Sequence, residues 1–278
     1  MKLTMQLDNI QDRKFPPVGR CVYCGSSGGV DGLRDEHIIA FSLGGNALLP
    51  EASCSDCEKI TSYLDGYLAR EVFGHFRIHA EVQTRRPRKR PTQLPINVIY
   101  QDRTEQPIVA IPDHPFAIVM PAFGLPGVLR DLPPSEVFQD AKLFHWYHAP
   151  DSLVDALGLE VGESAKVRMT GNLNAGTFAR ALAKIAHGLA VAYHGIDGFH
   201  ALLPDFIRGL YPYGPYLIGG RNDDPPPPSK ESLHEYALLG WPHGDQTFLV
   251  LVLRLFAIYG TPGRGMPIYY IVVGTEKN

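Results

Sequence analysis

Four cysteines are the residues whose type and spacing point most directly to chemistry. They form two C-x2-C pairs, Cys21 with Cys24 and Cys54 with Cys57, separated by 29 residues. A C-x2-C turn presents two thiolates to one tetrahedral ion, and a second such turn completes a four-cysteine site. We therefore expect a structural Zn2+ on these residues. The alternatives are four ordinary buried cysteines or two disulfides, and the lack of a signal-peptide pattern disfavours disulfides.

The segment between the two pairs carries residues suited to hydrolysis. Because 29 residues exceed the usual spacing of about 15 to 20, this segment must itself be folded. It contains Asp35-Glu36-His37, two isoleucines, a Gly44-Gly45 turn and Asn46. The unperturbed pKa of histidine allows general-base work near neutral pH, and a Mg2+-like ion supplies positive charge to a phosphate. The alternative for His37 is an ordinary core or surface histidine.

In this combination, residues 18–75 resemble the HNH endonuclease family, in the branch whose ββα-metal fold is pinned by zinc on four cysteines. The resemblance implies that His37 deprotonates the attacking water. It implies that Glu36 ligates the catalytic ion, Mg2+ or Mn2+, with Asp35 as the other candidate. It also implies that Asn46 orients His37 or holds the loop, and that Glu58 is the second ligand of the catalytic ion.

Two positions depart from the pattern of that family. Ala40 stands where proline is usual, and Glu58 stands where asparagine or histidine is common. A carboxylate is a competent ligand for a hard cation, so Glu58 either fills the role or marks a lapsed site. Two hypotheses therefore stay open. The first is an HNH-type endonuclease that hydrolyses DNA, and the alternative is a zinc-stabilised nucleic-acid-binding or interaction module with a decayed catalytic site.

A basic run follows this segment and predicts contact with DNA. Five of its six residues carry positive charge: Arg85, Arg86, Arg88, Lys89 and Arg90. Such a run fits phosphate contacts, and a solvated linker between modules is the alternative. Just before it, His75 and His79 have the i, i+4 spacing of metal ligands on a helix, although two surface histidines are the more ordinary interpretation.

The elements that position these residues follow from apolar periodicity and turn signals. A helix is expected after the second cysteine pair, and another from Ala175, with Asn174 as N-cap and Gly195 as its stop. A further helix is expected at 197–210, and strands at 96–100, 108–111, 116–120, 247–259 and 268–273. We predict an α+β fold in three segments. These are a ββα nuclease unit (1–82), a basic and proline-rich region (83–165) and an α+β domain of unknown role (166–278).

Composition excludes several classes of protein. The 278 residues are 45% hydrophobic and 20% charged, so a sizeable core is expected rather than a disordered chain. No apolar run reaches the roughly 18 residues that a membrane span needs, and the first residues lack a secretory pattern. A cytoplasmic protein is therefore expected. The net charge of −3 argues against a general polyanion binder, so DNA contact rests on the local basic run. A homodimer through the last segment is a further hypothesis.

Overall fold

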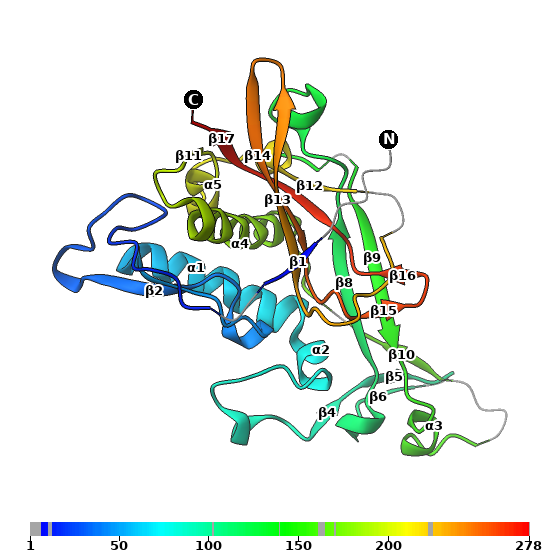
Figure 1. Cartoon of the computed structure of the whole chain (residues 1–278). Helices are drawn as coiled ribbons and strands as arrows, with labels where there is room; N and C mark the ends of the chain where they lie inside the picture. The colour runs from blue at the N-terminus through cyan, green and yellow to red at the C-terminus, as the bar shows by residue number, and fades with distance from the viewer. Residues whose placement is uncertain are drawn as a thin grey trace.

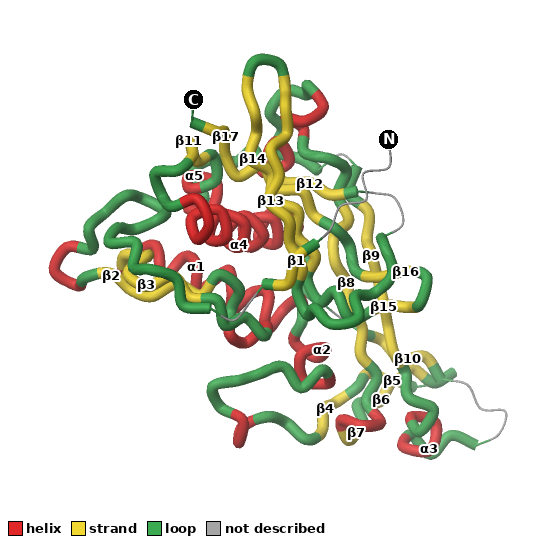
Figure 2. Tube along the Cα trace, viewed as in Figure 1, coloured by secondary structure: helices red, strands yellow, loops and turns green. Residues whose placement is uncertain are grey.

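The computed structural model describes residues 7–10, 13–101, 103–138, 140–160, 165–169, 171–221 and 225–277. Helices and strands are mixed along the chain (Figure 2), so the predicted α+β class is confirmed. The helices are α1 Ser55–Tyr67, α2 Gly74–His79, α3 Leu153–Ala156, α4 Ala175–His194, α5 Pro204–Arg208 and α6 Gly214–Leu217. None of the described helices is long and apolar enough to cross a membrane.

The largest sheet has the strand order β1-β13-β14-β17-β11, and β12 pairs separately with β17. All of its pairings are antiparallel. Its strands are β1 Asp8–Asn9, β11 Phe199–Ala201, β12 Ile218–Gly220, β13 Glu235–His243, β14 Gln246–Arg254 and β17 Tyr269–Glu276. Strand β14 is rich in residues that favour strands and is buried from Phe248 to Arg254.

Smaller sheets make up the rest of the strand structure. They are β2 Leu33–His37 with β3 Leu48–Cys54, β4 Gln93–Pro95 with β7 Ile108–Ala110, β5 Asn97–Ile99 with β6 Thr104–Glu105 and β10 Lys166–Arg168, β8 Phe116–Ala122 with β9 Lys142–His148, and β15 Gly260–Thr261 with β16 Arg264–Gly265. The strands expected at 96–100, 108–111 and 116–120 are therefore present as β5, β7 and β8.

Helix α4 lies between the large sheet and α1 (Figure 1). Its N-cap is Asn174, whose Oδ1 accepts a hydrogen bond from the backbone N–H of Thr177 at 2.8 Å, and Gly195 follows its last residue, as predicted. The helix is buried almost all round from Phe178 to Val191, as expected for an element packed on two sides. One continuous apolar cluster joins the β2–β3 hairpin, α1, α4 and the large sheet.

The helix expected at 197–210 is wrong in its first half. Phe199–Ala201 forms β11, which pairs with Gly274–Glu276 of β17, and only Pro204–Arg208 is helical. Strand pairing with a distant segment overrides the local helical pattern here, because the edge of the sheet offers hydrogen bonds that an isolated helix turn cannot match.

Candidate metal centre

The four cysteines converge at the junction of β3 and α1. Their sulfur atoms all lie within 4.8 Å of one another, and the Sγ atoms of Cys24 and Cys54 are 3.6 Å apart. Zn–S bonds of about 2.3 Å in a tetrahedron place two sulfurs about 3.8 Å apart, so the group has the dimensions of a zinc site. All four are free cysteines rather than disulfides. The group could therefore hold a metal ion such as zinc, as the spacing predicted.

Local structure explains why these four thiols meet. Cys54 ends β3 and is the N-cap of α1, which places Cys57 in the first turn of that helix. Cys21 lies in a tight turn, where the N–H of Gly25 donates to its carbonyl at 2.8 Å. Burial opposes the Cys54 thiolate, but the backbone N–H of Cys57 and the neighbouring thiols lower the pKa of Cys54 to about 7. A lowered pKa favours the thiolate that a metal requires.

Between the cysteine pairs, β2 and β3 form an antiparallel hairpin that is followed directly by α1, which gives the order ββα. The register pairs Leu33 with Cys54 and His37 with Leu48, with an irregularity between Arg34 and Glu36. The connecting loop turns at Gly44, whose φ is +88°, and a Cβ at Gly45 would collide with the carbonyl of Ile39. Both glycines are therefore required by the turn.

Glu36 is buried and its carboxylate is held by protein donors. It is only 5% exposed, and its carboxylate turns inward from β2 toward α1 and α4. Oε1 lies 2.9 Å from Nζ of Lys184, and Oε2 accepts a hydrogen bond from Thr61 at 3.1 Å. Both carboxylate oxygens are thus engaged by protein donors, and metal binding by Glu36 stays a prediction.

Lys184 provides the positive charge that lies against Glu36. Its side chain is fully buried, and its Nζ also lies 3.1 and 3.0 Å from the two oxygens of Asp65. The carbonyl of His37 accepts from the same ammonium, and the carbonyl of Ile38 lies 3.4 Å away. Burial opposes the charge, but Asp65 and Glu36 raise the pKa of Lys184 above its ordinary value. An internal ammonium ion therefore sits among carboxylate and carbonyl oxygens, the ligand type of a hard divalent cation.

His37 is the last residue of β2 and is half-buried, with its ring edge-on to Phe41 at a centroid separation of 6.4 Å. Burial, then the charges of Lys184 and Arg85, lower the pKa of His37. The imidazole is accordingly neutral at physiological pH, the form that a general base needs.

The other predicted site residues lie on β2, α1 and the loop of the hairpin. Asp35 is exposed and accepts from the N–H of Glu51 at 3.2 Å, and Asn46 is half-buried beside the Gly-Gly turn. Glu58 is on α1 with its side chain 46% exposed and 3.9 Å from Arg34. Glu58 and Asp35 are therefore the acidic candidates that stay open to solvent, whereas Glu36 is closed off.

The basic run begins near His37. Arg85, Arg86, Arg88 and Lys89 are exposed, around a single helical turn at Pro87–Lys89. The charge of Arg85 contributes to lowering the pKa of His37, which places the start of the run near that ring. Arg90 is half-buried, and its guanidinium donates to the carbonyl of Val82, so part of its role is to hold the chain.

Sequence reasoning missed two buried or half-buried basic residues, Lys184 and Arg77. Lys184 was hidden in an apolar helix, where a single cation between Ala183 and Ile185 is the only local signal. Arg77 was also missed. Burial and the charges of Arg90 and Arg70 lower the pKa of Arg77, so three guanidinium groups lie near one another.

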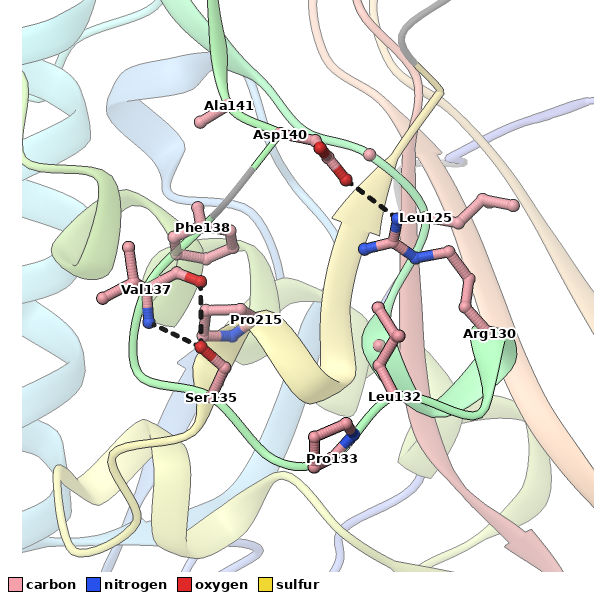
Figure 3. Close-up of a pocket in the computed structure, with 12 residues that line it drawn as sticks. Leu125, Arg130, Leu132, Pro133, Ser135, Val137, Phe138, Asp140, Ala141 and Pro215 are labelled. Carbon is pink, nitrogen blue, oxygen red and sulfur yellow. Dashed lines mark hydrogen bonds and ion pairs between the residues drawn. The ribbon is translucent and has the colours of Figure 1, made fainter.

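A separate hollow of about 100 Å³ lies beside the segment that follows β8 (Figure 3). Arg130 and Asp140 form an ion pair of 2.8 Å across its rim, and Ser135 donates to the carbonyl of Val137 at 3.2 Å. Apolar side chains such as Leu132 and Phe138 make up much of the remaining wall. The hollow contains none of the predicted site residues.

No family model, curated protein or solved structure matches this chain.

Proposed function

We propose that the chain is a zinc-stabilised nucleic-acid-binding protein, built on an HNH-like ββα unit whose catalytic cation position is taken by an internal lysine. The observation that carries this proposal is the buried ammonium of Lys184 against the carboxylate of Glu36 at 2.9 Å. A divalent ion at Glu36 would have to displace a lysine that Asp65 also holds. Two like charges repel strongly in one small buried space. The unit therefore binds nucleic acid and does not use Glu36 to hold a metal for cleavage.

The charge distribution around His37 supports binding to a polyanion. Arg85 lies close enough to His37 to contribute to lowering the pKa of that ring, and the exposed part of the basic run continues from Arg85. Exposed guanidinium and ammonium groups in one run neutralise phosphates and release counterions, which gives affinity without base-specific contacts.

Replacing the four exposed basic residues together (Arg85→Gln, Arg86→Gln, Arg88→Gln and Lys89→Gln) is expected to weaken binding to mixed-sequence duplex DNA. The slope of log affinity against log salt should become shallower by up to about 3.6, because each of four phosphate contacts contributes about 0.9. Fluorescence anisotropy across a salt series measures both quantities.

The matched control for this variant removes the same charge from exposed basic residues elsewhere, with Lys142, Lys166, Arg168 and Lys277 each changed to Gln. That control should keep most of the wild-type salt slope. Equal weakening by the two quadruple variants would show that net charge alone, and not the basic run, governs affinity.

A metal-dependent DNA endonuclease is the second candidate function. It is favoured by the half-buried, neutral imidazole of His37 and by two acidic side chains, the exposed Asp35 and the half-exposed Glu58. Under this alternative His37 takes a proton from water, and the exposed carboxylates rather than Glu36 hold the Mg2+ or Mn2+ ion.

Plasmid incubation with Mg2+ or Mn2+ separates the two candidates. We expect wild-type protein and His37→Ala to give the same low background, because the carboxylate most suited to hold the cation is paired with Lys184. The exposed substitution His200→Ala serves as a control for purification. The endonuclease would be established instead if wild type and His200→Ala both cleave the plasmid and His37→Ala cleaves it at least about a hundredfold more slowly. A loss of that size is the scale of general-base catalysis.

A further inference from the structure

Four histidines from three segments meet where α2 packs on the β8–β9 ribbon. His75 and His79 lie on α2, His114 precedes β8, and His148 ends β9. The ring of His114 lies 5.5 Å from that of His75 and 5.4 Å from that of His79, measured between centroids. His148 is the cross-strand partner of Phe116, and the ring centroid of Phe116 lies 5.5 Å from that of His148 and 4.6 Å from that of His79. We refer to these four residues as the histidine cluster.

Two nitrogens of the histidine cluster already have the spacing of metal ligands. Nε2 of His79 and Nδ1 of His114 are 3.3 Å apart. Metal–nitrogen bonds of about 2.0 to 2.1 Å in a tetrahedron place two nitrogens about 3.4 Å apart. When no ion is bound, the same two atoms can share one proton in a hydrogen bond. The spacing is therefore compatible with both the metal-free and the metal-bound cluster.

A backbone carbonyl orients His114 for such a role. Its Nε2 lies 3.4 Å from the carbonyl oxygen of Pro95. Because that oxygen can only accept, Nε2 is assigned the proton and Nδ1 directs its lone pair toward His79. A histidine that donates its second N–H to a carbonyl is the usual arrangement around a ligated metal, since it fixes both the tautomer and the ring.

His75 and His148 can supply the remaining metal ligands if their side chains rotate. His75 is four residues before His79 and so shares its face of α2. Both His75 and His148 are exposed, so their rings have room to rotate. Among the described residues, only the four cysteines already present three or more ligand atoms within 4.8 Å, so ring rotation is a required step.

We propose that the histidine cluster binds one divalent transition-metal ion of the Zn2+, Ni2+ or Cu2+ class, which joins α2 to the β8–β9 ribbon. The ligands are imidazoles, which suit these borderline ions and do not suit Mg2+ or Ca2+. This site does not depend on the proposed nucleic-acid binding.

The test uses full-length, tag-free protein whose cysteine centre is saturated with zinc and then freed of excess metal. Calorimetric titration with Ni2+ should show one further ion per chain. His75→Ala and His148→Ala should each weaken that event by more than about tenfold, the smallest loss seen when only an outer-shell partner of a ligand is removed. The double variant should abolish it. Both positions are exposed, so the variants are expected to stay folded, and circular dichroism verifies this.

A matched control is present on the same strand. His145 is exposed and lies three residues before His148, so its side chain projects from the opposite face of β9. His145→Ala should bind Ni2+ as wild type does. Absence of a further ion in wild type, or equal affinity in wild type and the double variant, would overturn the proposal and leave the cluster as packed imidazoles. Co2+ absorption free of sulfur charge-transfer bands would separate this ion from one in the cysteine centre.

Discussion

Removing the metal from the four-cysteine centre is expected to unfold the ββα unit. Structural zinc in small domains contributes an apparent binding free energy of about 10 to 16 kcal/mol at pH 7, and that energy is folding energy. Here the centre ties the turn at Cys21 to the start of α1 at Cys57. A chelator, or Cys57→Ser, should therefore lower the melting temperature sharply and expose residues 18–67 to protease.

The loss should extend beyond the metal centre. The carbonyl of Val22 lies 2.8 Å from Nε2 of His187 on α4, and Tyr23 is almost completely buried against that helix. When the turn opens, this buried His187 loses its partner, which costs about 1 to 3 kcal/mol. Calorimetry and metal analysis measure the two effects, and about one zinc per chain is expected at this centre.

Ser55→Ala is the matched control for Cys57→Ser, because Ser55 lies in the same helical turn and is not a ligand. It should retain the metal and melt close to wild type. If metal-free protein melts at the wild-type temperature, the cysteine group does not support the fold.

Features carried by short stretches of sequence could be predicted. The C-x2-C spacing brought four thiols together, and Asn174 caps α4 where the apolar pattern begins. The strands at β14 and β17 follow from dense Val, Leu and Ile. In each case the sequence signal is local, either the spacing within a turn or the residue types of one element, so these features could be predicted without knowledge of the remaining fold.

Features that depend on distant segments could not be predicted in the same way. The edge position of β11 exists only because β17 is there to pair with Phe199–Ala201. Lys184 meets the carbonyl of His37 across 147 positions of sequence. The resemblance implied a metal ligand at Glu36 because its residue type and position match the pattern of the family. In the structure the charge of Glu36 is balanced by Lys184 on α4, and no local pattern encodes how that helix packs.

Replacing Lys184 with methionine is expected to destabilise the protein by about 3 to 5 kcal/mol at pH 7, the cost of leaving a buried charge without its partner. Glu36 and Asp65 would both lose their cation, and the side chain of Glu36 is only 6% exposed. Urea unfolding followed by circular dichroism measures the change. Lys59→Met is the control, since Lys59 pairs with Asp56 on the exposed surface of α1, where such pairs contribute about 0 to 1 kcal/mol.

The sign of the pH dependence follows from the charges. The pKa of Lys184 is raised in the folded state. Its contribution to the stability of the fold is therefore fully present below the unfolded lysine pKa of about 10.4, and it is lost as pH rises through the pKa of the folded state. Lys184→Met instead leaves buried carboxylates, which gain stability when protonated. The difference between wild type and variant should therefore shrink as pH falls from 7 toward 5. A difference that stays constant with pH would mean that lost packing, rather than lost charge, causes the destabilisation.

The same variant tests whether the ammonium stands in for a divalent cation. With Lys184 removed, Glu36, Asp65 and the carbonyl of His37 present oxygen ligands around a vacated cation position. Lys184→Met should therefore be stabilised by millimolar Mn2+, and wild type should not, because a ligand that binds only the folded state raises its stability with concentration. Neutralising the cluster with Glu36→Gln and Asp65→Asn in the Lys184→Met background should restore stability and remove the Mn2+ effect. If Mn2+ stabilises wild type to the same extent, the ion binds elsewhere. Asp35 and Glu58 would then be the candidate ligands of a catalytic ion.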